Sequence, residues 1–273
     1  MNIRKIFIIT FCLSFIYSIS AAQTTDSASL ICLYNAKYIN DMQNPQKIKN
    51  EEMILLVGEK YSSFYSYTNF VVDSLQNANP IEYMPQAVVI DGGRRHRPPQ
   101  KRLPQTEYFD RFYIERSSGN LHCLTQILGR NYQYNEHLTT PEWNIMDVTL
   151  DILGYRCQKA TANYKGRNWI VWFTHEIPIS EGVWKLRGLP GLILKAEDSE
   201  KHYSFECTGI ERLTPPRPIV KNNSVIYQTV SKKDYDELYK TFFNNPSAYL
   251  EHVLGGKISI TSDKKREYNP IER

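Results

Sequence analysis

The sequence predicts a mainly β protein, with an antiparallel meander curled into a barrel-like or half-barrel sheet and with helices near the C-terminus. Three observations favour this fold class. Short stretches of alternating apolar and polar residues follow one another, with turn residues between them. Tyrosine, which suits half-buried strand faces, occurs 19 times. Apolar residues take up helical spacing in the segment 231–254, so the main helices should come after the sheet.

Residues 1–22 are typical of a secretory signal peptide. Arg4 and Lys5 give a basic start, an apolar stretch follows, and Ser20-Ala21-Ala22 offers small residues before a cleavage site. A transmembrane anchor is the alternative, but the apolar stretch is too short for one. We therefore expect an exported protein, in the periplasm or associated with an outer membrane.

The remaining residues, 23–273, are enough for one large β domain, and we expect a single domain. Cleavage after residue 22 removes Arg4 and Lys5 and lowers the formal net charge from +4 to +2. Such a small positive charge does not favour nucleic acid as a partner. No motif in the sequence predicts a cofactor.

Strands are expected wherever apolar residues alternate between turn signals. A short helix is expected over residues 69–75, and Pro215-Pro216-Arg217-Pro218 predicts a stiff connector after the last strand. Successive strands with short turns predict a meander. The expected strands cover residues 29–40, 51–57, 60–67, 108–116, 120–127, 131–137, 147–153, 155–164, 168–174, 189–198 and 202–213.

The segment 77–105 has the composition of a loop, because it holds five prolines and Gly92-Gly93. It also carries a basic cluster that includes Arg94, Arg95 and Arg97. A solvated loop is one interpretation of this cluster. The alternative is a patch for peripheral envelope contact, with anionic lipid headgroups, lipopolysaccharide or an acidic partner.

The segment 231–254 predicts two helices. Ser231 and Asp234 fit a capping box, and Asn245-Pro246 fits the start of a second, shorter helix. The first helix should be amphipathic and lie across the sheet. Its apolar positions follow a spacing of three and four residues: Tyr235, Leu238, Tyr239 and Phe242.

Four cysteines lie beyond the signal peptide: Cys32, Cys123, Cys157 and Cys207. An even number in an oxidising compartment permits two disulfides, and three pairings are possible. The alternative is four buried thiols. A zinc site is not favoured, because no two cysteines have the spacing of metal ligands.

The stretch Gly188-Leu189-Pro190-Gly191-Leu192-Ile193 predicts a tight turn that leads into a buried strand. Pro190 and Gly191 suit the two central positions of a type II turn, which would give Gly191 a positive φ. A structural corner is the first interpretation. The alternative is a binding lip lined by backbone, because glycines let a ligand approach closely.

This hexapeptide and its surroundings resemble the GLPGLI family of secreted Gram-negative proteins. Upstream of it lie Gly154-Tyr155-Arg156-Cys157, Gly166-Arg167, Trp172-Phe173-Thr174 and Gly182-Val183-Trp184-Lys185, in the order of that family's core block. Val183 replaces a proline that the family often has before the tryptophan. The resemblance implies an envelope location and association with an outer-membrane receptor, such as a TonB-dependent one. It implies no established activity.

The sequence contains no nucleophile elbow and no phosphate-binding loop. His175-Glu176 resembles half of a zinc-protease motif, but Ile177-Pro178 would break the required helix. We therefore assign no catalytic, cofactor or metal-binding residue. A non-catalytic binding, carrier or accessory protein is favoured over an uncharacterised hydrolase acting on peptide or glycan.

The candidate binding face consists of Trp169, Trp172, Trp184 and Arg167. Within the strand 168–174, alternation places Trp169 on one face and Trp172 on the other. At least one large aromatic side chain therefore needs a second covering layer, from the C-terminal helix or from an apolar ligand. Arg167 would orient an acidic ligand or form an ion pair at the turn.

Overall fold

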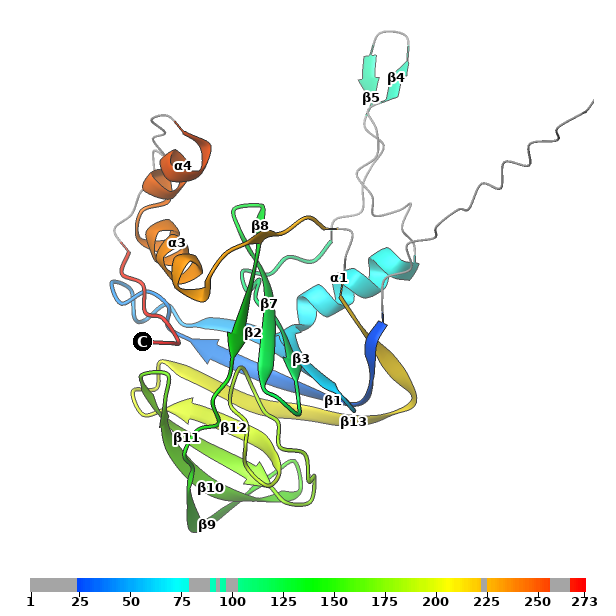
Figure 1. Cartoon of the computed structure of the whole chain (residues 1–273), viewed down its shortest axis with the longest axis vertical. Coiled ribbons are helices and arrows are strands. Elements are labelled where there is room, and N and C mark those ends of the chain that lie inside the picture. Colours follow the sequence, from blue (N-terminus) through cyan, green and yellow to red (C-terminus); the bar gives the residue numbers. More distant parts are fainter. Residues whose placement is uncertain (1–23, 79–88, 92–93, 97–102, 222–224, 256–265) are drawn as a thin grey trace, which may run out of the picture.

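The computed structural model describes residues 24–78, 89–91, 94–96, 103–221, 225–255 and 266–273 (Figure 1). The predicted signal peptide lies outside these residues. Arg97 also lies outside them, and Arg94 and Arg95 are described only in their backbone. Among the described helices, none is long and apolar enough to cross a membrane.

The fold class is confirmed: the described chain is mostly β and forms one large sheet that does not close. The twelve strands lie in the order β14-β8-β7-β6-β3-β2-β1-β13-β12-β11-β10-β9. All neighbours are antiparallel except β14 and β8. The strands are β1 (Thr24–Tyr38), β2 (Lys49–Gly58), β3 (Tyr61–Ser66), β6 (Arg111–Glu115), β7 (Asn120–Ile127), β8 (Arg130–His137), β9 (Asn144–Ile152), β10 (Tyr155–Tyr164), β11 (Arg167–Thr174), β12 (Leu192–Asp198), β13 (Tyr203–Val220) and β14 (Gln228–Thr229).

The sheet consists of two halves that meet at one seam. Strands β1 to β8 of the sheet, with β14 beside β8, form one half, and β9 to β13 form the other. The seam is the antiparallel pairing of β1 with β13, which runs from Thr24 opposite Val220 to Tyr38 opposite Tyr203. Strand β13 continues through the proline-rich run that predicted a connector, with Pro218 opposite Ser27. That expectation of a connector is therefore wrong.

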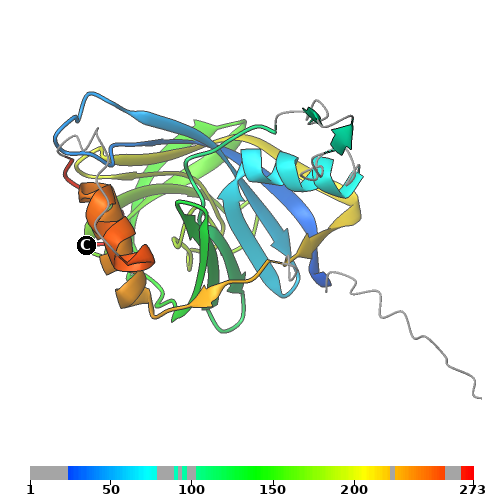
Figure 2. The ribbon, with the colours of Figure 1, turned by 90° about the horizontal axis from the view of Figure 1, so that it is seen from above.

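The curled sheet encloses the main core on its inner face (Figure 2). A smaller core on the other face is covered by α1 (Tyr67–Ala78). Tyr67 and Phe70 of this helix pack there against Ile54 and Tyr65. The helix begins two residues before the predicted segment 69–75 and extends beyond it.

The segment 77–105, predicted as a loop, contains a two-stranded sheet among its described residues. Strand β4 (Val89–Asp91) pairs antiparallel with β5 (Arg94–His96). The turn signal Gly92-Gly93 lies between them in the sequence, as expected for a hairpin.

The two predicted C-terminal helices are confirmed as α3 (Lys232–Asn244) and α4 (Pro246–Leu254). The Ser231 side chain accepts a hydrogen bond from the Asp234 amide at 3.1 Å, and Asn245 accepts one from the Ala248 amide at 3.0 Å. Each cap satisfies one amide that the first turn leaves without a partner. Figure 2 shows both helices beside the opening of the curled sheet.

The stretch 188–193 does form a corner that leads into the buried strand β12, but the type II turn is wrong. Gly191 does not have a positive φ, whereas Gly188 does, at 95°. A Cβ atom at Gly191 would overlap the carbonyl oxygen of Thr174. Gly191 therefore serves a close approach between two backbone segments.

The four cysteines of the described chain are all buried and all free, so the expected disulfides are absent. Their side chains belong to the inner core. Burial raises the pKa of Cys157 to about 11 and that of Cys207 to about 12. The thiols therefore stay protonated at neutral pH and act as small apolar groups.

Candidate functional site

A cavity of about 670 Å³ lies against the inner face of the sheet. Its sheet wall comes from both sides of the seam, with Ala36 on β1 and Phe205 on β13. The segment 107–110 before β6, the helix α3 and the C-terminal tail, residues 266–273, supply the other walls. The cavity is thus assembled from segments that are far apart in the sequence. Its volume is in the range of small-molecule binding sites.

Tyrosine side chains dominate the lining. The rings of Tyr38 and Tyr203 stack at 6.1 Å, those of Tyr134 and Tyr235 lie 5.3 Å apart, and Tyr239 lies 5.1 Å from Tyr268. Burial raises the pKa of these phenols, so their hydroxyl groups stay neutral and can donate or accept hydrogen bonds. The seven lining tyrosines are Tyr38, Tyr108, Tyr134, Tyr203, Tyr235, Tyr239 and Tyr268.

Asp110 is one of the carboxyl groups in this lining. It immediately precedes β6, and its Oδ1 accepts a hydrogen bond from Thr125 Oγ1 at 2.6 Å. The hydroxyl group of Tyr235 lies 3.3 Å from the same oxygen and 2.9 Å from Thr125 Oγ1. Burial raises the pKa of Asp110, against the lowering effect of these hydrogen bonds and of the more distant Lys185 and Lys232.

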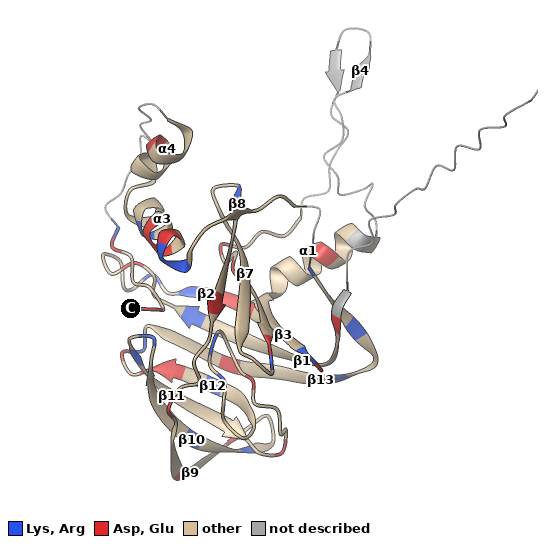
Figure 3. Cartoon of the chain, in the orientation of Figure 1, with Lys and Arg blue, Asp and Glu red and all other residues tan. Residues whose placement is uncertain are grey.

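Beside the cavity lies a buried ionic network. The Lys185 side chain is fully buried, and its ammonium group pairs with Glu136 at 2.5 Å and with Glu272 of the tail. Lys165 also pairs with Glu136, and Lys232 lies 3.5 Å from Glu272. Figure 3 shows charged residues of both signs along α3, next to this network. The network fixes the tail against the sheet and α3.

Arg167 holds the tail from the other side. Its guanidinium group pairs with buried Asp198 at 2.6 Å and donates to Asn269 Oδ1 at 2.7 Å. It also donates to the carbonyl oxygens of Pro270 and Ile271. These contacts occupy the group that the sequence offered as a ligand-orienting residue. Arg167 therefore contributes to the cavity by holding one of its walls.

The three tryptophans of the candidate binding face lie in different places. Trp169 and Trp184 are buried, with ring centres 5.6 Å apart, and Trp184 lines the cavity. Trp172 points to the opposite face of β11, where it is half-buried beneath Lys159 at 6.0 Å. The helix α3 packs near β8 and closes the cavity, and no contact of α3 with Trp172 is described.

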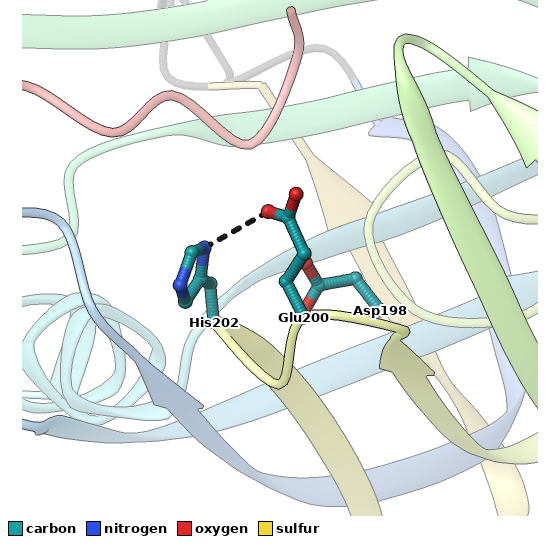
Figure 4. Close-up of side chains that lie close together, drawn as sticks. All are labelled: Asp198, Glu200 and His202. Atoms are coloured by element: carbon teal, nitrogen blue, oxygen red, sulfur yellow. Dashed lines mark ion pairs between the residues drawn. The ribbon is translucent and has the colours of Figure 1, made fainter.

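Asp198, Glu200 and His202 form a cluster of possible metal ligands whose ligand atoms lie within 4.8 Å of one another (Figure 4). Two arginines already neutralise its carboxylates, because Arg167 pairs with Asp198 and Arg273 pairs with Glu200. His202 Nδ1 lies 3.1 Å from Glu200. We therefore assign the cluster a structural role in anchoring the tail.

A second recess, of about 460 Å³, lies over β7 and β8 and holds two histidines. His122 Nδ1 lies 2.7 Å from the Asn135 amide oxygen, and His137 Nδ1 lies 3.1 Å from that of Asn120. Each imidazole is therefore oriented by an amide. In the part of the chain that the structure describes, neither histidine has a hydrogen bond to a serine, threonine or cysteine side chain, the contact through which a histidine base activates a nucleophile.

The sequence did not single out Asp110, the segment before it or the tail. The abundance of tyrosine was the available signal, but it marks strand faces and cavity walls alike. Asp110 stands between Phe109 and Arg111 without a motif around it. Its position becomes apparent only when β7 and α3 bring Thr125 and Tyr235 beside it.

Comparisons with known proteins give a limited picture. A family model described as "Protein of unknown function (Porph_ging)" matches residues 162–195. No curated protein sequence matches the chain significantly. Two solved structures of PNGF-II, in space groups P21 and C2, have TM-scores of 0.48 and 0.47 and identities of 14% and 13%.

The chain covers only about a third of each PNGF-II structure, 33% and 32%, while 77% and 76% of this chain is matched. At these TM-scores the likeness carries no argument about function. The match over 162–195 spans β11, the corner and the first residues of β12. The chain is thus similar, over this block, to a family whose function is unknown.

Proposed function

We propose that this protein is a non-catalytic binding or carrier protein that holds a small, partly apolar ligand in the tyrosine-lined cavity. The observation that carries the proposal is the cavity itself, about 670 Å³ in volume and walled by the sheet, α3 and the tail. Aromatic rings offer apolar contact area, while the phenol groups and Asp110 offer a few polar contacts that can fix an orientation.

We also propose that the chain is a GLPGLI-type protein that is exported through a signal peptide at residues 1–22. An envelope location follows from this proposal, as does an accessory role beside a TonB-dependent outer-membrane receptor. The stretch 188–193 and the basic start at Arg4 and Lys5 support it. N-terminal sequencing of the protein from the envelope fraction tests export, and an intact Met1 would contradict it.

The binding proposal is tested by filling the cavity. Ala36 lines it, so the larger side chain of Ala36→Phe can enter the cavity. This variant should keep a free energy of unfolding close to that of the wild type, and it should not bind the ligand that co-purifies with the native protein. Ala196 is the matched control: it is fully buried in the same core but does not line the cavity. Ala196→Phe should destabilise by about 1–3 kcal/mol, because the larger side chain would enter packed core and not the cavity.

Mass spectrometry of extracts from wild-type and Ala36→Phe protein gives the decisive comparison. A small molecule that is bound to the wild-type protein and missing from the variant supports the proposal. The proposal would be contradicted if the wild-type protein carries no ligand and if Ala36→Phe and Ala196→Phe both destabilise the fold. Turnover of peptide or glycan substrates would instead favour the hydrolase alternative.

A further inference from the structure

Asp110 is half-buried and forms no ion pair among the described residues, unlike the two fully buried acids, Glu181 and Asp198. Buried Glu181 lies 3.4 Å from Arg116 and 3.3 Å from Arg187, and buried Asp198 lies 2.6 Å from Arg167. Buried carboxylates generally require such a partner, because desolvating an unpaired charge is costly. The cavity wall therefore holds an acid that forms no ion pair among the described residues.

The hydrogen bonds of Asp110 leave one of its oxygens open. Thr125 and Tyr235 both approach Oδ1, and among the described residues no donor contacts Oδ2. The two nearby lysines are already committed, Lys185 to Glu136 and Glu272, and Lys232 to Asp236 and Glu272. Neither can become the counter-ion without abandoning another carboxylate.

Aromatic residues line the cavity together with this carboxyl group. The Tyr235 hydroxyl group lies 3.3 Å from Asp110 Oδ1, and Tyr108 and Tyr239 line the same cavity. Tyr235 and Tyr239 lie 6.0 Å apart. The faces of aromatic rings attract cations, and this attraction is stronger for a desolvated ammonium group. Aromatic rings in the same cavity as a carboxylate therefore suit such a group.

We propose that the cavity takes an organic cation, an amine or quaternary ammonium group on a small apolar body, with Asp110 as its counter-ion. This inference rests on the proposed binding function and names its ligand class. The cationic head lies beside Asp110 and the rings of Tyr108, Tyr235 and Tyr239. The apolar body extends toward Phe205 and Trp184, which line the same cavity.

Calorimetric titration with two matched probes tests the charge requirement. Choline carries the cationic head, and 3,3-dimethylbutan-1-ol is its neutral isostere. We expect the wild-type protein to bind choline more tightly than the isostere by at least about tenfold. Asp110→Asn should remove this preference while leaving the affinity for the neutral probe unchanged. Asp110→Glu should keep the preference for the cation, because it retains the carboxylate.

Glu237→Gln is the matched control, because Glu237 is an exposed acid of α3 that does not line the cavity. It should change choline affinity by no more than about twofold. Equal affinity for the two probes, or an Asp110→Asn variant that binds choline as the wild type does, would overturn the inference. If Ala36→Phe then still prevents binding of both probes, the proposed binding function is retained and only the cationic ligand class is rejected.

Absence of choline binding to the wild-type protein would also overturn the inference. In that case the ligand extraction from native protein decides the binding function independently. A circular dichroism spectrum and melting curve for each variant establish that a lost affinity is not a lost fold.

Discussion

At Asp110, the same burial that makes it a candidate counter-ion should weaken the fold at neutral pH. Burial raises the pKa of this carboxyl group in the folded state above its unfolded value. The folded state therefore holds the proton more tightly, and the contribution of Asp110 to stability is full at low pH and is lost as the pH rises through the folded pKa. The titratable and charged groups that interact with it are Lys185, Lys232, Cys123, Tyr38, Tyr108, Tyr134, Tyr235, Tyr239 and Tyr268.

Asp110→Asn should therefore be more stable than the wild type at neutral pH, by roughly 1 kcal/mol, and the difference should vanish in acid. Denaturant unfolding over a pH series measures it. Asp26→Asn is the control of opposite sign. Although burial raises the pKa of Asp26, amide hydrogen bonds from Tyr61, Ser27 and Lys60 lower it overall. That variant should lose stability relative to wild type as the pH rises, and parallel curves for both variants would contradict the assignment.

Gly191 is expected to tolerate no side chain. In Gly191→Ala the new Cβ would meet the Thr174 carbonyl oxygen, and a backbone group cannot move aside as a flexible side chain can. We expect a loss of about 1–3 kcal/mol in the free energy of unfolding. Gly209→Ala is the control, because its Cβ would meet only Leu33 Cδ1 at 3.9 Å. Equal stability of the two variants would contradict the close approach.

At the scale of elements, Arg167 is one of the residues that hold the tail, because it donates to Asn269, Pro270 and Ile271. Arg167→Met leaves Asp198 buried without its partner, so unfolding should become easier by about 3–5 kcal/mol. Adding Asp198→Asn should recover part of that loss. Arg273→Met breaks an ion pair with the exposed Glu200 and should cost only about 0–1 kcal/mol.

Limited trypsin digestion gives a second measurement of the same contact. Release of the tail should speed cleavage after Arg266 in Arg167→Met and leave the rate in Arg273→Met close to wild type. If both variants are cut at the same rate, Arg167 does not anchor the tail.

The elements could largely be predicted from the sequence, because alternation and capping are local signals. The buried face of β11 with Trp169, Val171 and Phe173 followed from a period of two. The starts of α3 and α4 followed from Ser231 and Asn245. The prediction of a type II turn was wrong because Gly191 serves a close approach to the backbone of Thr174. Thr174 is distant from Gly191 in the sequence, and no local motif signals this contact.

The candidate site was much less predictable than the elements. Its walls come from β1, β13, the segment before β6, α3 and the tail. No local sequence pattern in any of these segments indicates that they lie close together in the fold. The prediction of disulfides was wrong for a related reason. An even number of cysteines says nothing about which side chains lie close enough to form a bond. In the fold the thiols serve as small core residues.

For the whole molecule, we expect the edge of the described sheet at β9 to promote self-association. Strand β9 is the last in the sheet order, and the exposed apolar side chains on it and just beyond it are Ile145, Val148, Leu150 and Leu153. Exposed apolar edge strands are templates for pairing with another chain. Val148 is 45% exposed, so replacing it should have little effect on the fold.

Val148→Lys should therefore reduce aggregation during refolding and change the free energy of unfolding by no more than about 0.5 kcal/mol. Light scattering during refolding and denaturant unfolding measure the two effects. Thr149→Lys, on the neighbouring position of the same strand, is the control for added charge alone. Scattering that falls equally in both variants would attribute the effect to charge and not to the apolar edge.

The seam between β1 and β13 has a consequence for the order in which the molecule folds. Within each half, strands that follow one another along the chain can pair through local contacts. The seam instead joins distant segments, since Thr24 lies opposite Val220 and Tyr38 lies opposite Tyr203. Contacts of such high sequence separation form slowly, because the chain between them must first be confined. Since Ala36 and Phe205 face the cavity from the two sides of this seam, folding intermediates should lack the cavity, and ligand binding would report the completion of folding.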